Sequence, residues 1–278
     1  MQLLDQISLI AKQNGTSIPF ICGGLPRDKA LGKESDFQDI DLTTGDETIH
    51  ALANAVHNAI PGEFKVMDDK HATLIANNLK IDFSSNFINP AAKQLLDKTG
   101  LKNPTKMQLE LYSRDFTCNA LLMTMDLKVI KDPIGLGIQD IRAKKLRTCL
   151  PASVTLGIDN RRIVRAIYLA AKLGFEVDPE VISWVRSNPA IIANAGQGYI
   201  KRKLDQAVDY NIGITVKLLN EMKEQKLGPT INACNIVLKF LQHNLNLMEQ
   251  FLNLMKNKYS VEYNITTYEI LIDSYSSK

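Results

Sequence analysis

The chain has 278 residues, of which 45% are hydrophobic and 23% charged, and its formal net charge is +3. This composition is typical of an ordinary globular protein and excludes a low-complexity or disordered chain. The mild positive charge permits an RNA or nucleotide partner, but any basic binding surface has to be local.

The cell compartment follows from two further observations. No apolar run approaches the ~20 residues that cross a bilayer, and the N-terminal stretch has no basic region of the kind that begins a signal peptide. The four cysteines and four histidines are not spaced like zinc ligands. We therefore expect a cytoplasmic protein without membrane contact, whose cysteines are buried free thiols.

The first half of the chain alternates helical and strand-like segments. Apolar residues at helical spacing predict an N-terminal helix that ends at Gly15, and helices are also predicted over PRDKAL and ETIHALANAVHNAI. Strands are predicted at SIPFIC, DIDLTT, FKVM, ATLIANN and LKIDFSS. Residues 88–107 contain two prolines and no clear period, which predicts a long mobile connection, and residues 119–133 predict a hairpin that turns near Asp126.

Strand patterns stop at about Ser153, and helical periodicity continues to the end of the chain. The helical segments are NRRIVRAIYLAAKLGF, PEVISWVRS, YIKRKLDQAV, ITVKLLNEMKEQK and INACNIVLKFLQHNLNLMEQFLNLMKNKY. The sequence therefore predicts an α+β fold: a head over residues 1–150 with a small mixed or antiparallel sheet, followed by an all-helical neck and body.

Two carboxylates in the predicted strand DIDLTT indicate a metal site. Asp39 and Asp41 are two residues apart, so they project from the same face of the strand. They repel each other unless a cation lies between them, and hard oxygen ligands suit Mg²⁺ when substrate phosphates complete its coordination. Asp82 in LKIDFSS could reach the same site, and three carboxylates around two Mg²⁺ ions would activate a hydroxyl and stabilise a leaving pyrophosphate. The alternatives are a solvated strand end and the acidic pair of a sugar-nucleotide transferase.

A glycine pair precedes the acidic pair. Gly23 and Gly24 follow a predicted strand and precede the short helix PRDKAL, so that backbone N–H groups can approach a phosphate. Arg27 lies in the first turn of that helix, within reach of the same anion. The stretch therefore predicts a triphosphate site next to its magnesium site.

Four blocks follow one another along the chain. They are GGLPRDKALGKESDFQDIDLTT at 23–44, SRDFTCNALLMTMD at 113–126, DPIGLGIQDIRAKKLRT at 132–148 and IDNRRIVRAIYLAAKLGFEVDPE at 158–180. In this order they resemble the class II tRNA nucleotidyltransferase and bacterial poly(A) polymerase family, of the polymerase-β superfamily. The resemblance implies a nucleotidyltransferase head at 1–150, a neck at 151–210 that recognises the base, and an RNA-binding body at 211–278.

The resemblance implies an enzyme that adds C and A from CTP and ATP to the 3′ end of tRNA without a template and releases pyrophosphate. The alternatives are a poly(A), CC- or A-adding relative, a member acting on another RNA, and a non-catalytic RNA-binding descendant. Roles transfer only to residues that match the family. The triphosphate would contact Gly24, Arg27 and Arg114, and Asp39 and Asp41 would hold the two Mg²⁺ ions. Asp115 would contact the ribose, Asp159 and Arg162 would contact the base, and Arg165 would be a further nucleotide contact.

The base-reading pair has a physical rationale. Asp159 and Arg162 are three residues apart on a predicted helix and hence neighbours on its surface. One offers acceptors and the other a fork of donors, so together they could imitate a complementary base edge. A surface ion pair is the alternative. The basic run at 201–203 could likewise contact an RNA backbone or form a solvated helix face.

The chain also departs from the family pattern. Glu is replaced by Ile158, Asp82 and Lys203, and Arg by Ser113, Tyr168 and Tyr199. We expect catalysis to be intact and nucleotide selection to be looser than in relatives that keep the pattern.

Overall fold

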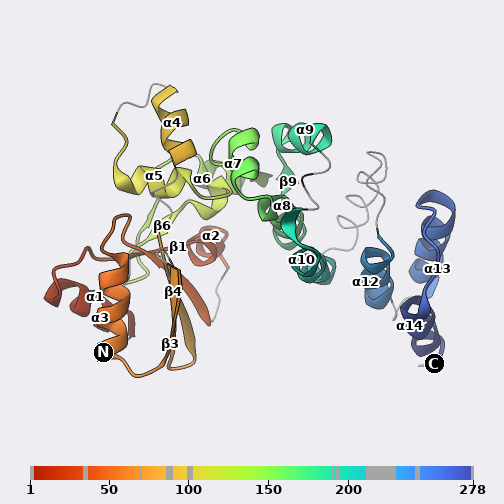
Figure 1. Cartoon of the computed structure of the whole chain (residues 1–278), viewed down its shortest axis with the longest axis horizontal. Coiled ribbons are helices and arrows are strands. Elements are labelled where there is room, and N and C mark those ends of the chain that lie inside the picture. Colours follow the sequence, from red (N-terminus) through yellow and green to blue (C-terminus); the bar gives the residue numbers. More distant parts are fainter. Residues whose placement is uncertain are drawn as a thin grey trace. The chain divides into compact units, whose positions relative to one another are not determined.

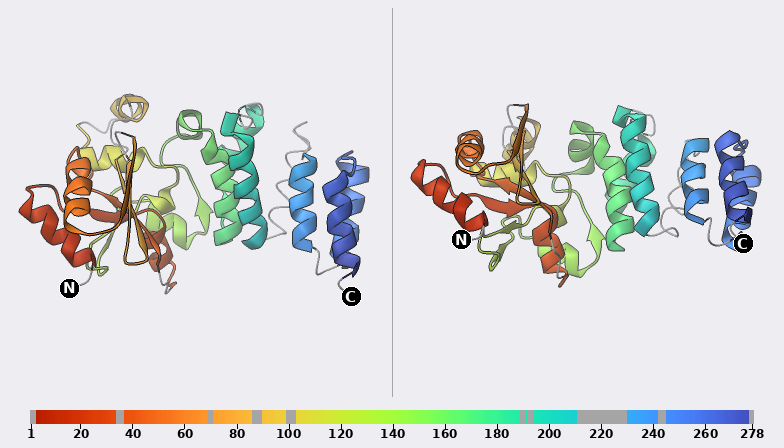
Figure 2. Two further views of the ribbon diagram at one scale, coloured as in Figure 1. Left: turned by 60° about the horizontal axis from the view of Figure 1, so that its bottom comes forward. Right: turned by 90° about the horizontal axis from the view of Figure 1, so that it is seen from below.

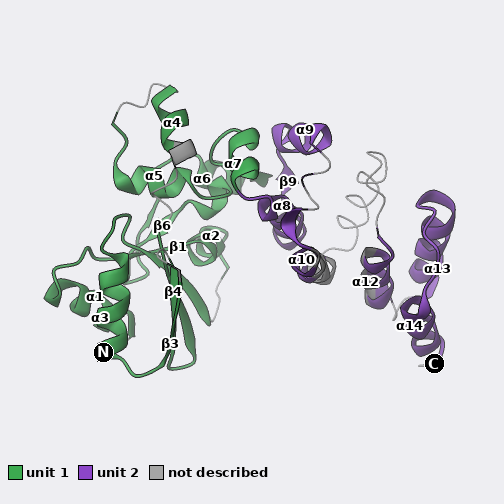
Figure 3. Cartoon of the chain, viewed as in Figure 1, with its two compact units in different colours: residues 1–158 green, residues 159–278 purple. Residues whose placement is uncertain are grey.

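The computed structural model describes residues 3–33, 37–68, 71–85, 90–98, 103–188, 191, 194–210, 230–241 and 245–276. The chain forms two compact units, residues 1–158 and 159–278 (Figure 3). The helix predicted over ITVKLLNEMKEQK lies outside the described residues. No helix in the described part of the chain is long and apolar enough to cross a membrane.

The first unit is built on a seven-stranded mixed sheet with the strand order β3-β4-β5-β2-β1-β6-β7. Its strands are β1 (Phe20–Cys22), β2 (Asp39–Thr43), β3 (Glu63–Asp68), β4 (His71–Ala76), β5 (Leu79–Ser84), β6 (Leu122–Met123) and β7 (Ile130–Lys131). β2 and β5 pair in parallel, and the other pairs are antiparallel. The α+β prediction is confirmed, as is the hairpin of β6 and β7.

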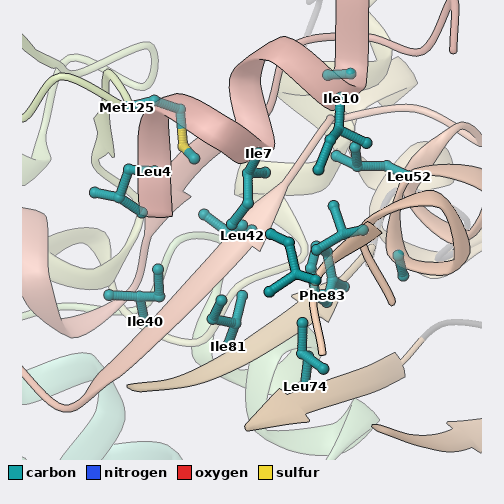
Figure 4. Close-up of a cluster of buried hydrophobic side chains, with 14 of the residues drawn as sticks. Leu4, Ile7, Ile10, Ile40, Leu42, Leu52, Leu74, Ile81, Phe83 and Met125 are labelled. Atoms are coloured by element: carbon teal, nitrogen blue, oxygen red, sulfur yellow. The ribbon is translucent and has the colours of Figure 1, made fainter. Parts of the chain in front are cut away.

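Helices α1 (Leu3–Gln13) and α3 (Ile49–Ala59) pack on one face of this sheet. Ile7 and Leu52 of these helices meet Ile40 and Leu42 of β2 in a core of buried apolar side chains (Figure 4). Side chains alternate along a strand. Asp39 and Asp41 therefore project from the other face of β2, away from α1 and α3. The remaining elements of the first unit are α2 (Gly24–Ala30), α5 (Lys106–Tyr112), η1 (Thr117–Asn119), α6 (Gly137–Arg142), β8 (Lys145–Leu146) and α7 (Ala152–Ile158).

The prediction of a connection without regular structure over residues 88–107 is wrong, because α4 (Pro90–Lys98) and the start of α5 lie within it. Pro90 is the first residue of α4, where a missing backbone N–H breaks no intrahelical hydrogen bond. Thr105 follows the second proline and caps α5, and its side chain and that of Gln108 form a reciprocal capping box. The two prolines therefore mark helix starts.

In the part that the structure describes, the second unit is helical, as predicted, with one exception. Its helices are α8 (Arg161–Leu173), α9 (Pro179–Ser187), α10 (Gln197–Tyr210), α12 (Ile231–Leu241), α13 (Leu245–Asn253), the π-helical turn η3 (Leu254–Lys258) and α14 (Ile265–Ser276) (Figure 1). The prediction that strands end at Ser153 is wrong at β9 (Glu176–Val177). Gly174 ends α8 in the left-handed region at φ 68°, so the chain can leave the helix directly into this strand.

Candidate active site

Three carboxylates lie on two neighbouring parallel strands. The register of β2 and β5 places Asp41 beside Asp82 and Asp39 beside Lys80. The Lys80 ammonium contacts the Asp82 carboxylate and lies 3.3 Å from Asp39 Oδ1. Thr73 Oγ1 donates to Asp82 Oδ1 at 2.6 Å. The fold thus brings Asp82 to the predicted pair and places the Lys80 cation among the three.

The electrostatics of this group fit a bound cation. Burial raises the pKa of Asp41, and the nearby charges of Asp82 and Asp39 raise it further, while Arg114 lowers it. The ammonium of Lys80 also lowers the pKa of Asp41. In the described part of the chain, no three Asp, Glu, His or Cys side chains are arranged to hold a metal ion by themselves. In nucleotide-binding enzymes Mg²⁺ is commonly held by one or two carboxylates together with substrate phosphates and water.

Gly23 forms the turn between β1 and α2 and lies against the carboxylate of Asp41. Its φ of 74° is in the left-handed region, and a Cβ atom at this position would lie 2.3 Å from Asp41 Oδ2. Both the conformation and the close approach require glycine. Gly24 is the first residue of α2. The glycine pair therefore brings a helix start directly beside the acidic pair, as the sequence predicts.

Arg114 and Glu110 form a buried ion pair near Asp41. Arg114 Nη2 donates to Glu110 Oε1 at 3.0 Å and to Cys22 Sγ at 2.8 Å. The side chain of Arg114 is 11% exposed and that of Glu110 is fully buried. Burial lowers the pKa of Arg114, but the carboxylates of Glu110 and Asp41 and the hydrogen bond to Glu110 raise it overall. Burial raises the pKa of the Cys22 thiol to about 12, so that this neighbour is neutral. Sequence reasoning missed Glu110, although its i,i+4 spacing from Arg114 is a usable signal.

Arg27 and Asp115, which lie far apart in the sequence, are joined through Asn119. Arg27 Nη1 donates to Asn119 Oδ1 at 2.7 Å, and Asn119 Nδ2 donates to Asp115 Oδ1 at 3.1 Å. Arg27 Nε donates to Asp28 Oδ1 at 2.8 Å. Arg27 and Asp115 are only 4% and 5% exposed. This chain of bonds ties α2 to η1, and Asp28 and Asn119 are members that sequence reasoning did not single out.

Residues 132–148, the third sequence block, contact η1 and so stabilise this hydrogen-bond network. Asp140, which is 1% exposed, accepts a hydrogen bond from Thr117 Oγ1 at 2.7 Å and pairs with Arg147 at 3.1 Å. A Cβ atom on Gly137 would lie 2.7 Å from the Thr117 carbonyl oxygen, so α6 packs closely on η1. The block therefore fixes η1, which carries Asn119.

The predicted base-reading residues lie in the second unit. Helix α8 begins at Arg161, so the prediction that Asp159 and Arg162 share a helix face is wrong, because Asp159 lies before the helix. The Asp159 carboxylate accepts from the Arg161 backbone N–H at 3.0 Å and from its guanidinium at 2.8 and 3.0 Å. Partial burial raises the pKa of Asp159, but these bonds from Arg161 lower it overall. Arg165 lies on the next turn of α8 and adds to this lowering.

Residues 19–147 match the family described as the poly(A) polymerase head domain. The chain is 29% identical over 181 residues to the tRNA nucleotidyltransferase cca2 of Schizosaccharomyces pombe, which covers 60% of this chain and 37% of that protein. It is 32% identical over 163 residues to the CC-adding tRNA nucleotidyltransferase of Shouchella clausii, and this match covers 59% of this chain and 37% of that protein.

The fold is similar to that of the Bacillus stearothermophilus CCA-adding enzyme in complex with CTP. The TM-score is 0.65 at 19% identity, and the match covers 97% of this chain and 66% of the other. The match spans less than half the length of the two curated relatives.

Proposed function

Since the chain belongs to the class II tRNA nucleotidyltransferase and bacterial poly(A) polymerase family, we propose that it adds C and A from CTP and ATP to the 3′ end of tRNA. One observation carries the proposal: Asp39 and Asp41 share a face of β2, Asp82 lies beside Asp41 on β5, and the Gly23 turn lies against Asp41. This combination supports the proposal of a metal site next to a phosphate-binding turn.

In the proposed reaction the terminal 3′-hydroxyl attacks the α-phosphate of the nucleotide. A bond forms between the 3′-oxygen and the α-phosphorus, the bond to the β-phosphate bridging oxygen breaks, and pyrophosphate leaves while the hydroxyl loses its proton. Gly23 and Gly24 would offer backbone N–H groups to the triphosphate, and the cation of Arg27 would add to the attraction. Asn119 and Asp28 hold Arg27, so its position is fixed before the substrate binds.

Nucleotidyltransferases of this family use divalent metal ions. We propose two Mg²⁺ ions, held by Asp39 and Asp41, with Asp82 completing the site. When bound, they would stabilise the negative charge that develops on the transferred phosphoryl group. Because Lys80 already contacts Asp39 and Asp82, its ammonium would keep these carboxylates in place until the substrate arrives.

Arg114 and Asp115 would serve the same site in different ways. Arg114 is largely buried against Glu110 and Cys22, so we assign it to holding Asp41 and to the electrostatic attraction of the phosphates. Asp115 would contact the ribose. Asp159 and Arg162 would read the base, and Arg165 would be a further nucleotide contact.

The remaining proposals concern the domain boundaries and the cellular compartment. We propose that residues 1–150 are the catalytic head, 151–210 the base-reading neck and 211–278 an RNA-binding body, of which residues 211–229, 242–244 and 277–278 lie outside the described residues. All four cysteines are buried free thiols, as predicted. Free thiols fit a reducing compartment, and we place the reaction in the cytoplasm.

A CC-adding activity is the second candidate. A specific observation favours it, because the Shouchella clausii relative at 32% identity is a CC-adding tRNA nucleotidyltransferase. The two candidates share the head and differ in whether ATP is accepted after two cytidines have been added.

The decisive experiment uses tRNA without its CCA end and each labelled nucleoside triphosphate, alone and in combination. Addition of two C and one A, which then stops, supports the proposal. Addition of C alone supports the CC-adding candidate, and a long A tail on arbitrary RNA supports a poly(A) polymerase. A protein that binds Mg²⁺ and nucleotide but extends no RNA would refute both tRNA candidates.

A further inference from the structure

Basic and tyrosine side chains gather on two adjacent helices of the second unit. Helices α8 and α10 lie side by side in both views of Figure 2. The ammonium of Lys203 on α10 lies 4.3 Å from the ring centroid of Tyr168 on α8, and that of Lys172 lies 5.9 Å from the same centroid. The guanidinium of Arg202 lies 5.5 Å from the ring centroid of Tyr199. These five residues are termed the basic–tyrosine face.

The cations of this face are crowded. Burial, followed by the positive charges of Arg165, Arg202 and Lys172, lowers the pKa of Lys203. The Lys203 ammonium donates to the neutral Gln206 Oε1 at 2.8 Å. Cations held this close repel one another, and an anion bound among them would relieve the repulsion.

Three members of the face are positions at which the chain departs from the family pattern. The pattern has Arg, Arg and Glu where this chain has Tyr168, Tyr199 and Lys203. The sum of charges is the same, +1 in both cases. The carboxylate, however, is gone, and two aromatic rings have been added. Because Tyr168 and Lys203 contact each other, these two departures lie together on the face.

We propose that the basic–tyrosine face binds the phosphate backbone of a single-stranded RNA end, with Lys172, Arg202 and Lys203 contacting phosphates and the two tyrosine rings contacting bases. Cations interleaved with aromatic rings are the combination that binds single-stranded nucleic acid. A triphosphate would use the cations but not the rings. The assignment rests on the proposed function, because that function requires an RNA substrate.

Fluorescence anisotropy with labelled tRNA that lacks its CCA end tests the proposal directly. Binding to the full chain is measured without nucleotide at several salt concentrations. Each backbone contact to a single strand contributes about 0.7 to the slope of log K against log salt. We expect Lys203→Gln to lower the slope by about 0.7 and to weaken binding about five-fold at about 0.1 M salt. Combining it with Lys172→Gln should double the change in slope.

Two controls accompany these variants. Lys203→Arg keeps the charge and should restore most of the affinity. Lys12→Gln removes the same charge from an exposed position on α1, on the sheet face opposite to Asp41, and should leave binding almost unchanged. If Lys203→Gln does not fold, Arg202→Gln on the exposed side of α10 provides the same measurement.

The outcomes separate this inference from the proposed function. The inference is wrong if Lys203→Gln weakens RNA binding no more than Lys12→Gln does. It is also wrong if RNA affinity is unchanged while the KM of every nucleoside triphosphate rises, because the cations then bind the triphosphate. A wild-type protein that shows the Lys203-dependent binding but transfers no nucleotide would refute the proposed function and leave the RNA site standing.

Discussion

Removal of the buried carboxylate of Glu110 should destabilise the first unit far more than removal of an exposed one. Glu110 is fully buried, and its partner Arg114 is 11% exposed. Deleting one member of such a pair leaves the other charge buried without it, at a cost of about 3–5 kcal/mol. With an m-value of about 2 kcal/mol/M, Glu110→Ala should lower the urea midpoint by about 1.5–2.5 M.

The matched control is Glu47→Ala. Glu47 pairs with Lys106 on the surface, where the two side chains are 63% and 54% exposed, and such pairs contribute at most about 1 kcal/mol. Glu110→Gln, which keeps an acceptor for Arg114, should fall between the two. All three variants are compared by urea unfolding followed by circular dichroism. Equal midpoints for Glu110→Ala and Glu47→Ala would refute the reasoning from burial.

Four further outcomes are expected. Asp41→Asn should reduce nucleotide transfer by about 10³-fold or more, since it removes several kcal/mol of charge stabilisation. Mg²⁺ at about 100 times its Kd should raise the Tm of the wild type by about 5–10 °C in thermal unfolding and leave that of Asp41→Asn nearly unchanged; an equal rise in both would exclude Asp41 as a ligand. Asp159→Ala should admit UTP and GTP, because unpaired polar groups cost about 1–3 kcal/mol each, and an equal loss for all four nucleotides in single-nucleotide assays would identify Asp159 as structural. Partial burial raises the pKa of Asp46, but hydrogen bonds from Ser17 and Thr48 lower it overall. The contribution of the Asp46 carboxylate to the stability of the fold is therefore present above the unfolded pKa of about 3.9, and it is lost as the pH falls through the folded pKa. Asp46→Ala should therefore destabilise the protein by about 2 kcal/mol at neutral pH and by much less in acid below the folded pKa of Asp46, as measured by urea unfolding under both conditions; the same loss in both would contradict it.

The sequence determined those features that depend on neighbours along the chain. Alternation in DIDLTT placed Asp39 and Asp41 on one face of a strand, and the structure keeps Ile40 and Leu42 on the other, buried face. The positive φ at Gly23 was foreseeable from a glycine pair between a strand and a helix. Two local signals were missed: Pro90 and Thr105 begin helices, although caps and prolines at helix starts can be recognised from sequence.

Only the tertiary structure decided which distant residues meet. The parallel pairing of β2 with β5 brings Asp82 beside Asp41, and no local pattern specifies that partner or its register, because register depends on how the whole buried face packs. The contacts of Arg27 with Asn119 and of Tyr168 with Lys203 likewise depend on how separate elements pack together. Hydrophobic periodicity fixes which side of an element is buried, whereas the polar contacts between elements arise only when those buried sides have packed against one another.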